Sequence, residues 1–231
     1  MEKLVEEHIV CVEGLSFSYS DRKVLSDLSF SVQKGESLLI LGPSGVGKST
    51  VLNILGGLLE FSKGTIVGPP TDRIRMVFQK PRLFPWLSVR QNLYFALRAA
   101  DVPKEQWKER IEPLLDLVGL IGELDRSVAQ LSYGMAQRIA LVRALCCHPE
   151  LLLLDEPFSA LDPRRRSMLN TELKQLQKIL NTSIVMVTHD IEEAIFLGDQ
   201  ILVLDDVKSH LLRSSREQSI SLRDKLRDLL L

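Results

Sequence analysis

Two short stretches of the sequence carry residues suited to phosphate chemistry, and the first is GPSGVGKST at residues 42–50. It follows the pattern G-x-x-x-x-G-K-[ST] and stands between an apolar run and a helix-like segment. In such a loop the glycines let backbone N–H groups converge on phosphate oxygens, Lys48 adds positive charge, and the Ser49 hydroxyl can bind Mg²⁺. We predict a phosphate loop that binds a nucleotide through Gly42, Pro43, Ser44, Gly45, Val46, Gly47, Lys48, Ser49 and Thr50.

The second stretch is LLLLDEP at residues 151–157, an apolar run that ends in two acids. Asp155 would stand at the carboxyl end of a strand, where it can hold Mg²⁺ directly or through water. Glu156 follows with a different orientation and can polarise a water for attack on a γ-phosphate. A solvated acidic turn is the simpler interpretation, but the phosphate loop favours a metal-binding and catalytic role.

A third stretch, QLSYGMAQR at residues 130–138, places a Ser-x-Gly turn ahead of an amphipathic helix. The start of a helix is a site for an anion, and Ser132 and the Gly134 N–H would be the donors. Tyr133 stands between these small residues. A positive φ would strain a tyrosine, so we expect a negative φ and a ring turned away from the phosphate.

Short apolar runs indicate the elements that must position these residues. The runs at 38–41, 151–154, 184–187 and 201–204 are typical of strands buried on both faces, and hence of a parallel sheet covered by helices. IVCV at 9–12, LSFSY at 15–19 and LSFSV at 28–32 alternate in part and predict a small antiparallel sheet with one face in water.

The middle of the chain, from Gln91 to His148, has a helical pattern. Apolar residues at helical spacing include Trp107, Ile111, Leu114 and Val118, followed by Met135, Ile139 and Val142. Pro113 should kink or break the first of these helices. A further core helix is expected over residues 168–180. The prediction is an α/β core that a helical lobe interrupts and that resumes at Leu151.

Composition narrows the class of protein. The 231 residues carry a formal charge of −1, which disfavours a nucleic-acid partner. Three cysteines are too few and too badly spaced for a disulfide framework or a zinc site. The first ten residues lack the apolar segment of a signal peptide, and no apolar run approaches the ~18 residues that cross a bilayer. Any membrane role is therefore expected to depend on a partner.

Taken in order, these pieces resemble the ATP-binding subunit of ATP-binding cassette (ABC) transporters along nearly the whole chain. LSYGMAQR is similar to the signature motif of that family, usually LSGGQ, and SALD at 159–162 to its D-loop. VTHD at 187–190 would carry the switch histidine, His189, and Gln79 in VFQ matches the Q-loop. Tyr19 stands where the family places the aromatic residue that stacks on adenine.

The resemblance implies a P-loop NTPase core with an N-terminal antiparallel β subdomain and an inserted helical subdomain. It implies one domain over residues 1–231, with the core at 1–84 and 151–231 and the helical subdomain at 85–150. Glu156, His189 and Gln79 would be catalytic, and Ser49, Gln79 and Asp155 would hold Mg²⁺. Besides the phosphate loop, the residues expected to contact ATP are Tyr19, Ser132, Gly134 and Asp162.

The resemblance also implies a head-to-tail homodimer in which each signature motif faces the phosphate loop of the other subunit. The sequence agrees, because it has one phosphate loop and a second anion site without a ligand of its own. Hydrolysis of ATP would then open the dimer.

KPRLFPWLSVRQNL at residues 80–93 is similar to importers of the nitrate, sulfonate and taurine type. Membrane-spanning permease subunits of the family dock here, so we expect their contact over Gln79–Asn92. The subunit would lie on the cytoplasmic face of the membrane as a peripheral protein, and an extracytoplasmic solute-binding protein would complete the importer.

Other function classes stay open. The same ATPase could serve an exporter or a lipid-extraction system, since the membrane subunits largely set direction. A soluble ABC ATPase acting on DNA or ribosomes is disfavoured by the single cassette, the near-neutral charge and the lack of coiled-coil heptads. A small-molecule kinase with a phosphate loop would have no need of a signature motif or D-loop. The transported molecule does not follow from the sequence.

Overall fold

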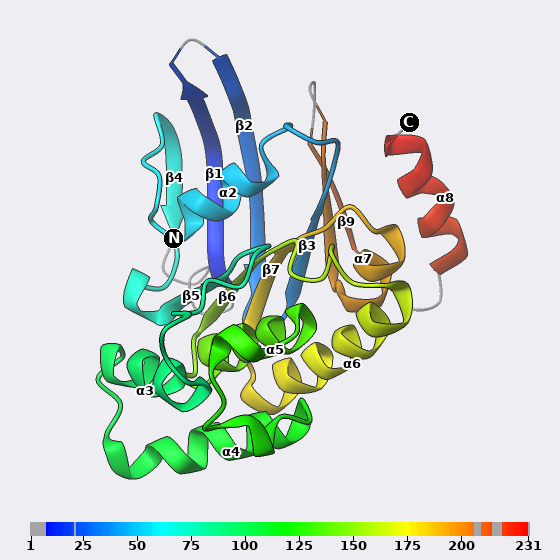
Figure 1. Ribbon diagram of the computed structural model, residues 1–231. Coiled ribbons are helices and arrows are strands. Elements are labelled where there is room, and N and C mark those ends of the chain that lie inside the picture. Colours follow the sequence, from blue (N-terminus) through cyan, green and yellow to red (C-terminus); the bar gives the residue numbers. More distant parts are fainter. Residues whose placement is uncertain (1–7, 21, 206–208, 214–218, 231) are drawn as a thin grey trace.

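Two β-sheets and the helices around them form the fold of the computed structural model (Figure 1). The structure describes residues 8–20, 22–205, 209–213 and 219–230. Over this part of the chain, one sheet has the strand order β2-β1-β4 and the other the order β5-β6-β7-β3-β8-β9.

The larger sheet carries the continuous apolar runs. Its parallel strands are β5 (Ile74–Val77), β6 (Leu151–Asp155), β7 (Ser183–Val187), β3 (Ser37–Leu41) and β8 (Gln200–Leu204). An antiparallel strand, β9 (Ser209–Arg213), pairs with β8 at one edge. The four predicted runs are β3, β6, β7 and β8, and the sheet prediction is confirmed.

The smaller sheet consists of β1 (His8–Tyr19), β2 (Arg22–Gln33) and β4 (Lys63–Val67), all antiparallel. The antiparallel sheet was expected, but the separation of IVCV from LSFSY was wrong, because both belong to β1. The pairing with β2 shifts between Val12 and Leu15, and Gly14 takes φ 62° there. Glycine can take the positive φ that a β-bulge requires, so β1 continues through Gly14 as one strand.

Successive residues of the large sheet enter two different hydrophobic cores. Leu38 and Ile40 pack with the small sheet and α2 (Lys48–Leu55), whereas Leu39 and Leu41 pack on the other face with the helices. This alternation explains why the strands are apolar on both faces. The sheet is thereby fixed rigidly between two layers.

The helical middle lies between β5 and β6 and contains α3 (Val89–Ala99), α4 (Trp107–Leu117) and α5 (Tyr133–Leu145). The prediction at Pro113 was a kink or a break; the helix α4 runs through Pro113, so there is no break. Its buried face, with Ile111, Leu114 and Leu115, packs into the core and offsets the lost hydrogen bond. Short 3₁₀ turns stand at Thr71–Arg73, Lys104–Gln106, Ile121–Glu123 and Val128–Gln130.

The remaining helices are α6 (Pro163–Leu180), α7 (Ile191–Leu197) and α8 (Ser219–Leu230). The helix α6 begins five residues before the expected start at 168, because Asp162 caps it and Pro163 suits its first position. None of the described helices combines the length and the apolar character that a membrane span requires.

Candidate nucleotide site

The phosphate loop joins the end of β3 to the start of α2. Gly42 and Gly47 have φ values of 151° and 110°, and a Cβ atom on Gly42 would come within 2.3 Å of the Leu204 carbonyl oxygen. Glycine is therefore required here. Gly47 is the N-cap of α2 and gives no side-chain hydrogen bond to the helix. The first N–H groups of α2 are thus available to an anion.

Lys48 is folded back into this loop. Its Nζ donates hydrogen bonds to the Gly42 and Pro43 carbonyl oxygens at 2.8 and 2.9 Å. Burial lowers the pKa of the Lys48 ammonium, and the charges of Glu156 and Asp155 partly oppose that effect. A buried cation of this kind favours an anionic ligand nearby.

Ser49 and Asp155 come together although 106 residues separate them. The Ser49 hydroxyl donates to Asp155 Oδ1 at 2.9 Å. Burial raises the pKa of the Asp155 carboxyl, while the hydrogen bond from Ser49 lowers it to a smaller extent. A half-buried carboxylate beside a hydroxyl is an oxygen donor set of the kind that Mg²⁺ takes up together with phosphate oxygens and water. The two residues therefore fit the predicted metal.

Glu156 follows at the turn after β6. It has φ 42°, uncommon for this residue type, and its N–H donates to the Val187 carbonyl at the end of neighbouring β7. His189 follows β7, and its Nδ1 lies 3.4 Å from Glu156 Oε2. The predicted acid and histidine are thus neighbours because β6 and β7 are paired.

A hollow of about 430 Å³ opens beside the phosphate loop. Its lining combines predicted residues from three parts of the chain: Tyr19, Ser44, Gly45, Gly47, Lys48, Ser49, Thr50 and Glu156, with Arg22 and Val24. Tyr19 is half-exposed and its ring meets that of Phe17 edge-on, with centroids 4.7 Å apart. Phe17 is buried, so Tyr19 is the aromatic residue that can stack on a base.

Gln79 and the start of α5 lie beside this site. Gln79 Nε2 donates to Ser159 Oγ at 3.2 Å, and Ser159 Oγ donates to the Glu156 carbonyl at 3.1 Å. Ser132 is the N-cap of α5 and accepts a hydrogen bond from the Met135 N–H. Tyr133 does not have a positive φ, as expected, and its hydroxyl donates to the Gln79 carbonyl at 2.6 Å.

Residues 25–159 match the family model described as ABC transporter. The chain belongs to this family. ATP hydrolysis is the activity expected of an ABC ATP-binding domain. The predicted fold class is confirmed as well.

Relatives of the chain include importer subunits with different solutes in their names. It is 41% identical over 208 residues to the spermidine/putrescine import ATP-binding protein PotA of Clostridium novyi, covering 86% of this chain and 60% of that protein. It is 43% identical over 192 residues to the aliphatic sulfonates import ATP-binding protein SsuB 2 of Burkholderia cenocepacia, covering 80% of this chain and 70% of that one. These names do not single out the nitrate, sulfonate and taurine type. The chain spans between 54% and 60% of the lengths of the PotA relatives.

Among solved structures, cbiO1 of Clostridium perfringens, described as part of the ABC transporter complex cbiONQ, aligns with a TM-score of 0.84. The two are 29% identical, and the alignment covers 96% of this chain and 94% of that one.

Some features of this ABC site escaped the sequence analysis. Ser159 was noted only as part of SALD, although it connects Gln79 to the Glu156 turn. Arg22 lines the hollow without having carried any motif. Asp162, expected at the nucleotide, accepts a hydrogen bond from the Arg165 N–H as the cap of α6. Its role across a dimer stays a prediction.

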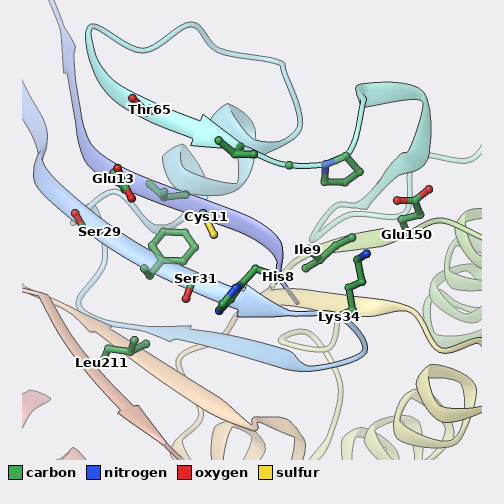
Figure 2. Close-up of a pocket in the computed structure, with 15 residues that line it drawn as sticks. His8, Ile9, Cys11, Glu13, Ser29, Ser31, Lys34, Thr65, Glu150 and Leu211 are labelled. Atoms are coloured by element: carbon green, nitrogen blue, oxygen red, sulfur yellow. The ribbon is translucent and has the colours of Figure 1, made fainter. Parts of the chain in front are cut away.

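A larger hollow lies elsewhere on this ABC domain. Its volume is about 550 Å³. Figure 2 shows its lining over the small sheet, with His8, Cys11 and Glu13 from β1 and Leu211 from β9. The residues of the phosphate loop are not in its lining.

Proposed function

We propose that the chain binds ATP with Mg²⁺ and hydrolyses it to drive a membrane importer. The observation that carries this proposal is the single hollow onto which Tyr19, Lys48, Ser49 and Glu156 open, with Asp155 bonded to Ser49. An adenine platform, a phosphate loop and a metal-binding pair in one place suit a nucleoside triphosphate.

Binding uses groups that are already in position. Tyr19 would stack on adenine, and the N–H groups at the start of α2, with Lys48, would hold the phosphates. Ser49, Asp155 and Gln79 would hold Mg²⁺. When bound, this ion supplies neutralisation of the negative charge that the phosphate oxygens carry.

In hydrolysis, Glu156 and His189 would have separate roles. Glu156 would orient a water and accept its proton during attack on the γ-phosphate. His189, 3.4 Å from that carboxylate, would hold Glu156 and the water in place or stabilise the developing charge.

The proposal requires two copies of the chain, arranged head to tail. The start of α5 would place Ser132 and the Gly134 N–H on the γ-phosphate held by the partner subunit, and Asp162 would connect the two sites. Hydrolysis removes the group that both subunits bind, so the population shifts toward the open dimer.

The connection between β5 and α3, residues 78–88, is the proposed docking region for a membrane-spanning permease. Trp86 is 76% exposed, and Phe84 packs against both Trp86 and Phe95. Asn92 is buried and exchanges hydrogen bonds with the backbone of Phe84, so it braces the loop from behind. Exposed aromatic side chains on a braced loop suit a protein partner.

A third hollow, about 890 Å³, adjoins this loop and includes Arg82, Phe84 and Phe95 in its lining. It would receive the part of the permease that inserts between the loop and the helices. The subunit would then be peripheral, on the cytoplasmic face, and an extracytoplasmic solute-binding protein would complete the complex.

For the solute we propose a small anionic or organic molecule of the nitrate, sulfonate or taurine type. Residues 80–93 support this choice, and the name of SsuB 2 agrees with it. The polyamine in the name of PotA points to a cation instead.

The test is to express the tagged Glu156→Gln variant in its native host, trap it with ATP and Mg²⁺, and identify the proteins that co-purify. We expect a multi-span membrane protein and a solute-binding protein, whose ligand then identifies the solute. Trp86→Ala in the same background is the control, since it should keep bound ATP and lose the membrane protein. A membrane protein alone would favour export or lipid extraction. Ribosomes or DNA without a membrane protein would overturn the transport assignment.

A further inference from the structure

One face of α5 donates hydrogen bonds to two successive backbone carbonyls of its own chain. The Tyr133 hydroxyl donates to the Gln79 carbonyl at 2.6 Å, and Gln137 Nε2 donates to the Phe78 carbonyl at 3.3 Å. Tyr133 and Gln137 are one helical turn apart and so lie on the same side of the helix. The start of α5 is thereby attached to the residues that follow β5.

Further hydrogen bonds connect this loop to the turn that carries Glu156. The Gln79 side chain reaches Ser159, and Ser159 reaches the Glu156 carbonyl. Three hydrogen bonds, with donor–acceptor distances of 2.6, 3.2 and 3.1 Å, therefore connect the tyrosine to the turn that carries Glu156. Since Glu156 holds an uncommon φ of 42°, a small shift of this turn would move its carboxylate.

The first link depends on the phenol itself. Gln137 is fully buried and anchors the helix, whereas Tyr133 is 39% exposed at the first position of α5. Glycine, the residue usual at this place in the signature motif, has no side chain that could reach Gln79. Phenylalanine would keep the ring and lose the donor.

We propose that Tyr133 is a positioning residue, which attaches the start of α5 to the loop that carries Gln79. When α5 contacts the nucleotide held by the partner subunit, this attachment would shift the positions of Gln79 and Glu156 in the chain to which Tyr133 belongs. The inference rests on the proposed dimeric ATPase. Its consequence is that the two sites of a dimer respond to one another: when one nucleotide contacts Ser132 and Gly134, Glu156 of the same chain is positioned to orient the water that attacks the other nucleotide.

The matched variants are Tyr133→Phe and Tyr94→Phe. Each removes one hydroxyl from the helical subdomain, and Tyr94 contacts Arg90 and Trp107 away from the proposed site. Amide hydrogen exchange of the nucleotide-free protein tests directly whether Tyr133 attaches α5 to the Gln79 loop. We expect the amides of Gln79, Lys80, Arg82 and Leu83 to exchange about 2- to 10-fold faster in Tyr133→Phe, as one lost hydrogen bond implies, and to stay at the wild-type rate in Tyr94→Phe.

The kinetics of ATP hydrolysis then test whether Tyr133 influences the position of Glu156. We expect kcat of Tyr133→Phe to fall about 2- to 10-fold with KM for ATP changed less than about twofold, and its Hill coefficient to move toward one. Equal exchange in the two variants would overturn the attachment. Faster exchange with unaltered kcat and Hill coefficient would overturn the influence on Glu156. A wild-type chain that does not hydrolyse ATP would refute the proposed function, and the exchange data would still decide whether the attachment exists.

Discussion

Two helix starts in this chain are suited to an anion, and they are built differently. The start of α2 is enclosed: Gly47 and Lys48 are buried, and the glycine cap makes no side-chain hydrogen bond to the helix. The start of α5 is open: Ser132 is exposed and its hydroxyl already accepts a hydrogen bond from the Met135 N–H. The cap residue of α2 makes no side-chain hydrogen bond to its helix, and the cap residue of α5 does.

The difference indicates how the two ends are used. At α2 a bound phosphate would accept hydrogen bonds from the orphan N–H groups and would pair with the buried Lys48 charge, so we expect this end to bind a nucleotide within one chain. At α5 the Ser132 hydroxyl already accepts a hydrogen bond from one N–H group of the helix start, so a bound anion would add less binding free energy. Such an end suits a contact that forms and breaks as two subunits close and open.

The largest expected effect follows from Lys48→Ala. Loss of this charged donor should weaken ATP binding about 10- to 100-fold, since hydrogen bonds to charged groups contribute about 1.5–3 kcal/mol. Titration with a fluorescent ATP analogue measures the change. Lys34→Ala, at an exposed lysine beside the distant hollow, is the control and should bind normally. Equal affinities for the two variants would remove Lys48 from the site.

Next in size is the contrast between Gly47→Ala and Gly134→Ala. A Cβ on Gly47 would lie 2.8 Å from Val24 Cγ1 at φ 110°, so we expect a loss of about 1–3 kcal/mol in the free energy of unfolding. The nearest atom to a Cβ on Gly134 is Leu161 Cδ2, at 3.7 Å, and alanine favours a helix there. Urea unfolding should therefore show no loss for Gly134→Ala, and equal losses would contradict the contrast.

Much of the nucleotide-binding half was predictable from the sequence, because its residues stand at the ends of continuous apolar runs. The strands β4, β5 and β9 were missed, since IRMV has only four residues and KGTIV and SHLLR are short and mostly or alternately exposed. IVCV and LSFSY were predicted as two separate runs, because the bulge that joins them in β1 depends on pairing with β2. The contact from Tyr133 to Gln79 joins residues 54 apart and depends on how α5 packs beside β5, which no local pattern encodes.

The smallest expected effect is that of Ser132→Ala. Removing the cap of α5 should lower the free energy of unfolding by about 1 kcal/mol. Affinity of the single chain for ATP should stay unchanged, because α2 provides that site, while hydrolysis should decrease with the lost contact to the partner subunit. Calorimetric unfolding, ATP titration and turnover measure the three quantities. Weaker ATP binding with normal turnover would reverse the roles assigned to the two helix starts.

The central claim is that α5 completes the ATP site of a second copy of the chain. Sedimentation velocity of the Glu156→Gln variant, with and without ATP and Mg²⁺, tests it most directly. We predict a monomer without nucleotide, a dimer with it, and less dimer when Ser132→Ala is added. A monomer that binds ATP at every protein concentration tested would contradict the claim, and so would a dimer indifferent to Ser132.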